Sequence, residues 1–285
     1  MNTQHKLVIN FTPTGMVPTK AMTPHVPVGV SEIVEQVHAA CTIGITLVHL
    51  HARDIHSGEP TYHKEIYREI VEGIRRHCPE LVICLSLSGR NFNEFPKRSE
   101  AIELQPDMGS LTLISLNFPR QASVNAPDMI DSLAEKMEAY GVHPELEVFD
   151  LGMIHFAHYL IRKNRIRPPF YFNLIFGNLA GMQTDLAEIG LALHQLPPDS
   201  LWALGGIGRQ QLQANAIAIS TGGGVRVGLE DNLYFDRDKK ILARNADLLK
   251  RIHTLAEIFE RPVMTPAEFG QLGFYNTKIP RTVAQ

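Results

Sequence analysis

Short apolar runs alternate with longer amphipathic segments along the chain. The short runs have the length of buried strands, whereas the longer segments repeat apolar residues every three or four positions, as helices do. The runs predict β-strands at residues 7–12, 45–51, 81–86, 108–112, 145–150, 170–175, 201–203 and 225–229. The longer segments predict helices at residues 31–40, 64–75, 127–140, 151–163, 184–195, 209–219 and 245–259.

Alternation of strands and helices is typical of a parallel sheet. Eight strands fit a closed (β/α)8 TIM barrel, an α/β fold that takes about 250 residues, and this chain has 285. We expect Ser31 to be the N-cap of the first helix and the irregular link 89–107 to hold only a short helix. Because no low-complexity linker divides the chain, residues 1–285 are expected to form a single barrel domain with a short carboxyl-terminal extension from about residue 262.

Composition narrows the class of protein. The chain is 44% hydrophobic and 20% charged, with a formal net charge of -3, which offers no electrostatic footprint for nucleic acid and favours a small-molecule enzyme. Residues 1–6 do not resemble a signal peptide, so none is expected, and no apolar stretch approaches the ~20 residues that cross a bilayer. Its three cysteines, Cys41, Cys78 and Cys84, lack C-x-x-C spacing and are expected to be free thiols in a cytoplasmic protein, with Cys84 in the core.

The candidate chemistry gathers at the ends of two predicted strands. His49 and His51 occupy alternate positions, so both imidazoles point to one face at the carboxyl end of their strand. Such a pair is either half of a metal site or two core imidazoles with hydrogen-bond partners. Glu230 follows strand 225–229. In a barrel this strand and strand 45–51 both flank strand 7–12, so Glu230 is the natural third ligand. The alternative for residues 230–232 is a helix-capping turn. Two His and one carboxylate leave coordination positions open, as catalytic Zn2+ requires.

These residues belong to a longer pattern. It comprises residues 12–15 (TPTG), 49–54 (HLHARD), 144–147 (PELE), 203–209 (ALGGIGR) and 225–232 (VRVGLEDN). In order and spacing, the pattern resembles the β-keto acid cleavage enzymes, a zinc-dependent TIM-barrel family that includes 3-keto-5-aminohexanoate cleavage enzyme. The resemblance covers nearly the whole chain. It implies an acyltransferase that converts a β-keto acid and acetyl-CoA into acetoacetate and a new acyl-CoA, in an assembly that is a homo-oligomer, most simply a homotetramer.

The resemblance also implies roles for individual residues. His49, His51 and Glu230 match the family's zinc ligands, and Arg226 and Asp231 match its catalytic dyad. Three further residues match substrate-binding positions of the active site: Ser86, which corresponds to a serine that binds the substrate carboxylate, Ser110, which replaces a threonine, and Glu147.

The implied chemistry suits these residue types. Polarisation of the 3-keto oxygen by Zn2+ would stabilise the enolate that forms when Asp231 removes a C2 proton. Arg226 would orient the Asp231 carboxylate and favour its charged form, at some cost to its basicity. The enolate would then attack acetyl-CoA, and the released thiol would complete a retro-Claisen cleavage.

One position departs from the family's amino-substrate enzyme. Val17 stands where that enzyme has a glutamate that meets the substrate ammonium. An apolar side chain cannot balance a buried cation, so we expect a neutral or anionic β-keto acid in place of 3-keto-5-aminohexanoate. Lys20 and Arg90 lie in loops at the same face and are candidates to receive a second carboxylate, although solvated surface positions are the alternative for both.

Two other functions compete with this one. A metal-dependent hydrolase of the amidohydrolase type also carries His-x-His at a barrel strand, but on its first strand and with further His ligands on later strands. A non-catalytic metal- or acyl-CoA-binding protein could use the same scaffold, because fold alone does not specify function. The Arg226 and Asp231 pair argues against simple binding, since a binding protein needs no poised base.

Overall fold

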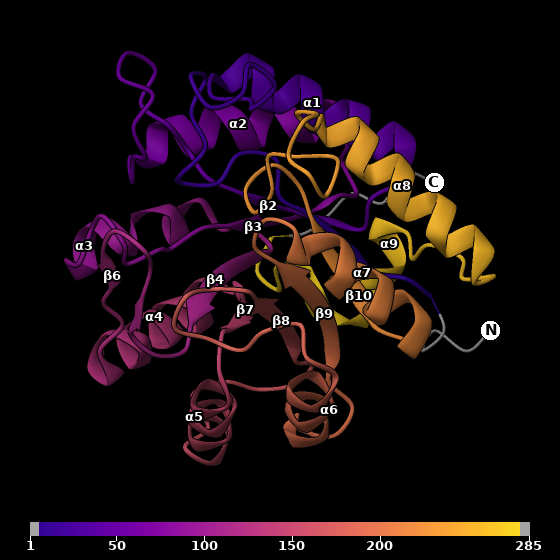
Figure 1. Cartoon of the computed structure of the whole chain (residues 1–285). Helices are drawn as coiled ribbons and strands as arrows, with labels where there is room; N and C mark the ends of the chain where they lie inside the picture. Colours follow the sequence, from indigo (N-terminus) through magenta and orange to yellow (C-terminus); the bar gives the residue numbers. More distant parts are fainter. Residues whose placement is uncertain (1–5, 280–285) are drawn as a thin grey trace.

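The computed structural model describes residues 6–279, in which eight parallel strands close into a barrel (Figure 1). The strands are β1 (Ile9–Phe11), β2 (Leu47–Leu50), β3 (Val82–Leu85), β4 (Met108–Thr112), β7 (His143–Val148), β8 (Tyr171–Phe176), β9 (Leu201–Gly206) and β10 (Gly224–Val227). β1 closes the barrel, because Asn10 pairs with Leu47 of β2 on one side and with Arg226 of β10 on the other. The predicted TIM-barrel fold and all eight predicted strands are confirmed.

The predicted helices form the outer layer of the barrel. They are α1 (Val30–Ile43), α2 (Lys64–His77), α4 (Pro127–Tyr140), α5 (Leu151–Arg162), α6 (Leu186–Gln195), α7 (Gln210–Thr221) and α8 (Asn245–Ile258). The expected N-cap Ser31 is wrong, because α1 begins after Gly29. The carboxylate of Glu32, the third residue of α1, accepts hydrogen bonds from the backbone N–H groups of Val28 and Gly29 at 2.9 and 3.1 Å. These bonds fix the start of the helix at Gly29.

Shorter elements fill the remaining connections. The link after β3 holds the short helices α3 (Phe95–Arg98) and η2 (Glu100–Leu104), as its irregular pattern indicated. A small hairpin of β5 (Leu116–Asn117) and β6 (Ala122–Ser123) follows β4 and was not predicted, because two-residue strands leave no periodic pattern. The last elements within residues 6–279 are α9 (Pro266–Phe269) and the π-helix η3 (Gly270–Phe274).

Alternate strand residues point into the barrel and make its amino-terminal end apolar. Val8, Leu47, Val82, Met108 and Tyr171 form a buried cluster with the carboxyl-terminal segment. That segment is fixed by the Met264 N–H, which donates to the Leu7 carbonyl at 2.8 Å, and by the rings of Phe269 and Phe274, which stack 4.2 Å apart below Tyr171. The extension from about residue 262 therefore closes the amino-terminal end of the barrel.

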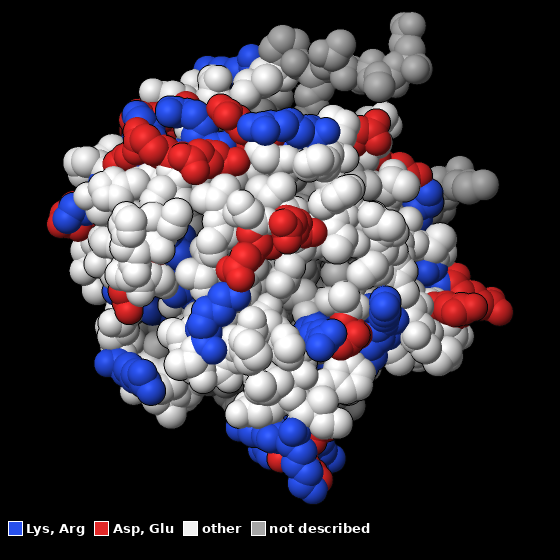
Figure 2. Space-filling model, turned by 90° about the horizontal axis from the view of Figure 1, so that it is seen from above, with Lys and Arg blue, Asp and Glu red and all other residues white. Residues whose placement is uncertain are grey.

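The outer surface carries charge of both signs. On the face in Figure 2, basic and acidic groups are interspersed among uncharged residues, without an extended field of one sign. Within residues 6–279, no helix has the length and apolar character needed to span a bilayer.

Candidate active site

The carboxyl-terminal end of the barrel interior is polar, in contrast to the other end. The inward-facing positions there are two or four residues beyond the apolar layer on the same strands, since strand side chains alternate between faces. They are occupied by Asn10, Thr12, His49, His51, Cys84, Ser86, Ser110, Thr112, Glu145, Glu147, Asn173 and Arg226, all of them buried or nearly so.

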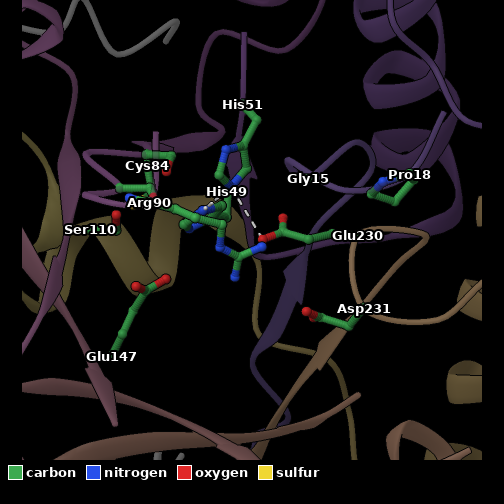
Figure 3. Close-up of polar contacts among 12 residues, drawn as sticks. Gly15, Pro18, His49, His51, Cys84, Arg90, Ser110, Glu147, Glu230 and Asp231 are labelled. Atoms are coloured by element: carbon green, nitrogen blue, oxygen red, sulfur yellow. Dashed lines mark hydrogen bonds and ion pairs between the residues drawn. The ribbon is translucent and has the colours of Figure 1, made fainter. Parts of the chain in front are cut away.

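The three predicted metal ligands meet at this end of the barrel (Figure 3). His49 Nε2 lies 3.3 Å from His51 Nε2, which lies 3.2 Å from Glu230 Oε1. A tetrahedral zinc ion with bonds of about 2.0–2.1 Å separates its ligand atoms by about 3.3–3.4 Å. The second carboxylate oxygen of Glu230 is buried without a hydrogen-bond partner among the described residues. The donor set therefore fits a divalent metal ion.

Glu145 holds the His49 ring in place through a contact with its Nδ1 atom. Its Oε2 lies 2.5 Å from His49 Nδ1, and its side chain is fully buried. The amide groups of Asn10 and Asn173 donate to the other oxygen at 2.5 and 3.1 Å, and the Cys84 thiol also contacts the carboxylate. A carboxylate on Nδ1 fixes the histidine tautomer and directs Nε2 toward a metal. Sequence reasoning missed Glu145, although its place two residues before Glu147 put it on the same strand face.

The pKa values of the two histidines shift in opposite directions, because the carboxylates outweigh burial at His49 and do not outweigh it at His51. Burial alone would lower the pKa of His49, but Glu145 and Glu230 outweigh it and raise that pKa to about 9. Burial dominates for His51 and lowers its pKa to about 4. The pKa of Glu230 stays well below its usual range despite burial, because Arg226 and His51 stabilise the carboxylate. The centre is thus rich in negative charge and able to hold a cation.

Arg226 and Asp231 form the predicted pair. Arg226 Nε donates to Asp231 Oδ2 at 2.7 Å, and its Nη2 donates to Glu230 Oε1 at 2.6 Å. The remaining nitrogen, Nη1, is buried, lies 3.8 Å from Glu147 and makes no hydrogen bond within residues 6–279. Arg226 lowers the pKa of Asp231, as expected, but it does not decide the net shift. Burial and the neighbouring Glu230 raise the pKa of Asp231 by more than Arg226 lowers it.

The three predicted substrate-binding residues also line this end. Ser86 is buried directly after β3, in the wall of a small cavity that it shares with His51. Ser110 Oγ accepts the backbone N–H of Leu87 at 3.0 Å, which ties β4 to the loop after β3. Glu147 Oε2 accepts the Thr112 hydroxyl at 2.6 Å.

The loop after β1 borders the opposite side of the site. Gly15 has a φ of +66°, and a Cβ there would lie 2.5 Å from Glu230 Cγ, so this position requires glycine. Arg53 holds the loop by donating to the carbonyls of Gly15 and Pro18, each at 2.9 Å. Val17 lies between these anchors and is 53% exposed, so it is at the rim of the site rather than in its interior.

Comparisons with known proteins identify the family. The model of the β-keto acid cleavage enzyme family matches residues 6–272. The chain is 36% identical over 264 residues to 3-oxoadipate:acetyl-CoA acetyltransferase of Cupriavidus necator, covering 92% of each protein. It is 35% identical over 264 residues to 3-keto-5-aminohexanoate cleavage enzyme of Acetoanaerobium sticklandii, covering 92% of this chain and 96% of that protein. The apo structure of ObcA shares the fold alone, with a TM-score of 0.75 at 21% identity over 90% of this chain and 67% of that one.

The chain therefore belongs to the β-keto acid cleavage enzyme family, as its sequence pattern predicted. The hydrolase alternative finds no support within residues 6–279. His49 is on β2 and His51 directly follows this strand, whereas His143 of β7 packs against Phe274 at the opposite end of the barrel. The prediction of a carbon-carbon bond-cleaving acyltransferase is confirmed at the level of the family.

Proposed function

We propose that the protein transfers the acyl group of a β-keto acid to coenzyme A, with acetyl-CoA as co-substrate and acetoacetate as the second product. The observation that carries this proposal is a carboxylate, Asp231, held by Arg226 directly beside the His49, His51 and Glu230 cluster. Two relatives support the choice of reaction by name, one an acetyl-CoA acetyltransferase acting on 3-oxoadipate and one a β-keto acid cleavage enzyme.

His49, His51 and Glu230 would hold one zinc ion per chain. The chemistry that zinc supplies in such a site is polarisation of a carbonyl oxygen, which makes the neighbouring C2 proton more acidic. Glu145 keeps the His49 Nε2 lone pair directed into the site. Zinc fits the all-nitrogen-and-oxygen donor set and the ligand spacing described above.

Asp231 would accept the C2 proton of the substrate. The raised pKa of Asp231 strengthens it as a base, and the hydrogen bond from Arg226 Nε keeps its carboxylate oriented. The C2 carbanion displaces the thiolate of acetyl-CoA, the thiolate attacks the original keto carbon, and the C2–C3 bond breaks. Asp231 then returns its proton to C2 of the departing acetoacetate, so protons and electrons balance.

Other residues would bind the substrate. Ser86 and Ser110 would donate hydroxyl protons to its carboxylate, and Glu147 would lie against the reacting carbons. Val17 offers no charge to a substrate tail. Because a cation there gains no carboxylate partner, we expect the amine 3-keto-5-aminohexanoate to be a poorer substrate than a neutral or anionic β-keto acid.

A spectrophotometric assay of CoA-ester exchange tests the proposal. Zinc-loaded protein is mixed with acetyl-CoA and each of 3-oxohexanoate, 3-oxoadipate and 3-keto-5-aminohexanoate, and acetoacetate is measured. We expect turnover that depends on acetyl-CoA, with a higher kcat/KM for 3-oxohexanoate than for the amine. Hydrolysis without acetyl-CoA would support a hydrolase instead, and a clear preference for the amine would show that another acidic group recognises it.

The homotetramer and the cytoplasmic location stay predictions from the sequence. Light scattering of the purified protein measures the first, and a mass of four chains is expected. Fractionation of the source cells tests the second.

A further inference from the structure

One arginine at the site has neither an ion-pair partner nor a side-chain hydrogen bond among the described residues. The side chain of Arg90 forms no ion pair within residues 6–279, and its Nε is buried without a hydrogen bond. The other loop cation predicted at this face, Lys20, is occupied, because its Nζ lies 2.5 Å from Glu32 and 3.4 Å from the Pro24 carbonyl. A buried guanidinium donor without an acceptor is costly, which favours a ligand that supplies one.

The fold presents Arg90 to the site in a fixed orientation. Its Cζ lies 3.5 Å from the centroid of the Phe118 ring, which comes from the hairpin of β5 and β6. Stacking covers one face of the guanidinium plane and leaves its edge, which carries the N–H groups, free to bind a carboxylate with two parallel hydrogen bonds.

The loop that carries Arg90 is clamped to the same hairpin. Arg98 is buried and donates to the carbonyls of Leu87 and Val124, which lie before Arg90 and after β6. Gly89 fits between them, since a Cβ there would lie 2.5 Å from the Val124 oxygen. Ser110 holds the start of this loop through Leu87.

Arg90 lies on the same side of the site as Ser110, one of the two serines proposed to bind the substrate carboxylate. Figure 3 shows Arg90 and Ser110 on one side of the histidines and Gly15 and Pro18, which flank Val17, on the other. Burial lowers the pKa of Arg90, whereas Glu230, Glu147 and Asp231 raise it, so its guanidinium lies within electrostatic range of these carboxylates. An anionic substrate that enters among these carboxylates requires a cation close to its own negative charge.

We infer that Arg90, together with Ser86 and Ser110, binds the C1 carboxylate that every β-keto acid carries. This inference rests on the proposed function. It replaces the sequence-based expectation that Arg90 receives a second carboxylate on the substrate tail, because the tail side at Val17 is across the site. Lys20 is paired and also contributes no charge to the tail. The substrate class that fits is a β-keto acid whose tail carries no positive charge.

The test compares Arg90→Gln, Arg90→Lys and the matched control Lys20→Gln. Titration calorimetry of zinc-loaded protein with acetoacetate measures carboxylate binding without turnover. We expect Arg90→Gln to weaken acetoacetate binding about 10- to 100-fold, Arg90→Lys to recover part of the loss, and Lys20→Gln to match the wild type. KM for 3-oxohexanoate and 3-oxoadipate should rise by the same factor, while KM for acetyl-CoA stays constant.

Each other outcome is decisive. A loss confined to 3-oxoadipate would place Arg90 on the tail, and a loss confined to acetyl-CoA would place it on the cosubstrate; either result overturns the inference. Unchanged acetoacetate binding in a folded Arg90→Gln protein does so as well. If the wild type binds acetoacetate through Arg90 but turns over no β-keto acid, the proposed function fails and the carboxylate site stands.

Discussion

The two ends of this barrel are built from the same strands but hold opposite kinds of residue. At the amino-terminal end, Tyr171 packs against Phe269 and Phe274, and all three side chains are fully buried. At the carboxyl-terminal end, positions only two or four residues further along the strands carry histidines, carboxylates and Arg226. Buried apolar contacts stabilise a fold wherever they occur, whereas buried charges must be matched by specific partners.

The comparison separates stability from chemistry. Changes at the closed end should lower the free energy of unfolding and leave the site intact. Changes at the polar end should remove metal binding or turnover while the barrel stays folded, because its stability comes mainly from apolar contacts buried elsewhere.

The largest effect is expected from the double substitution His49→Ala and His51→Ala. Loss of two of three ligands should abolish stoichiometric zinc and turnover while the circular dichroism of the barrel is kept. Elemental analysis of the purified protein measures the zinc content. His155→Ala is the control, since His155 is an exposed helical residue of α5. Full zinc content in the double variant would remove these residues from the metal site.

Asp231→Asn should come next. An amide cannot accept the C2 proton, so kcat should fall by about 10²- to 10⁴-fold while zinc and fold are retained. Steady-state kinetics on the best β-keto acid measures the change. The control is Asp238→Asn, which alters an exposed carboxylate a few residues away. A near wild-type kcat would show that another group is the base.

At the closed end, Phe269→Ala should destabilise the protein by about 3–5 kcal/mol, because it opens a cavity in a fully buried aromatic cluster. Urea unfolding measures the loss, and zinc content and kcat of the folded protein should be unchanged. Leu272→Ala is the matched control in the same segment, where a side chain that is 37% exposed should contribute less than 1 kcal/mol. Loss of zinc from Phe269→Ala would contradict the separation of the two ends.

The smallest effect is expected from Glu145→Gln. The amide oxygen can still accept from His49 Nδ1, but the charge that strengthens this ligand is gone, so zinc affinity should fall about 10- to 100-fold. Competition with a chelator measures the affinity. Glu147→Gln provides the contrast, because Glu147 bonds Thr112 and touches neither histidine. Equal losses in both variants would mean that net charge, rather than the contact with His49, controls metal affinity.

Much of the fold followed from periodicity along the chain. Strand and helix spacing predicted the barrel, and alternation within strand 45–51 placed His49 and His51 on one face. Barrel closure brought Glu230 beside them, since β2 and β10 both pair with β1. The hairpin that carries Phe118 was missed, because two-residue strands leave no periodic signal. The N-cap at Gly29 was missed because the hydrogen bond from the Val28 N–H to the Glu32 side chain, which fixes the helix start, leaves no such signal either.

The sequence by itself determined which residues point into the barrel and at which end they lie, because alternation and chain order are properties of each strand alone. Tertiary structure decided which side chains meet across the interior. Glu145 reaches His49 over 96 positions of sequence, and Arg90 is stacked on Phe118 while Lys20 is neutralised by Glu32. Tertiary structure also decided whether the pKa of Asp231 rises or falls. Burial raises this pKa and Arg226 lowers it, and the larger effect depends on how deeply Asp231 is buried and how close Arg226 lies.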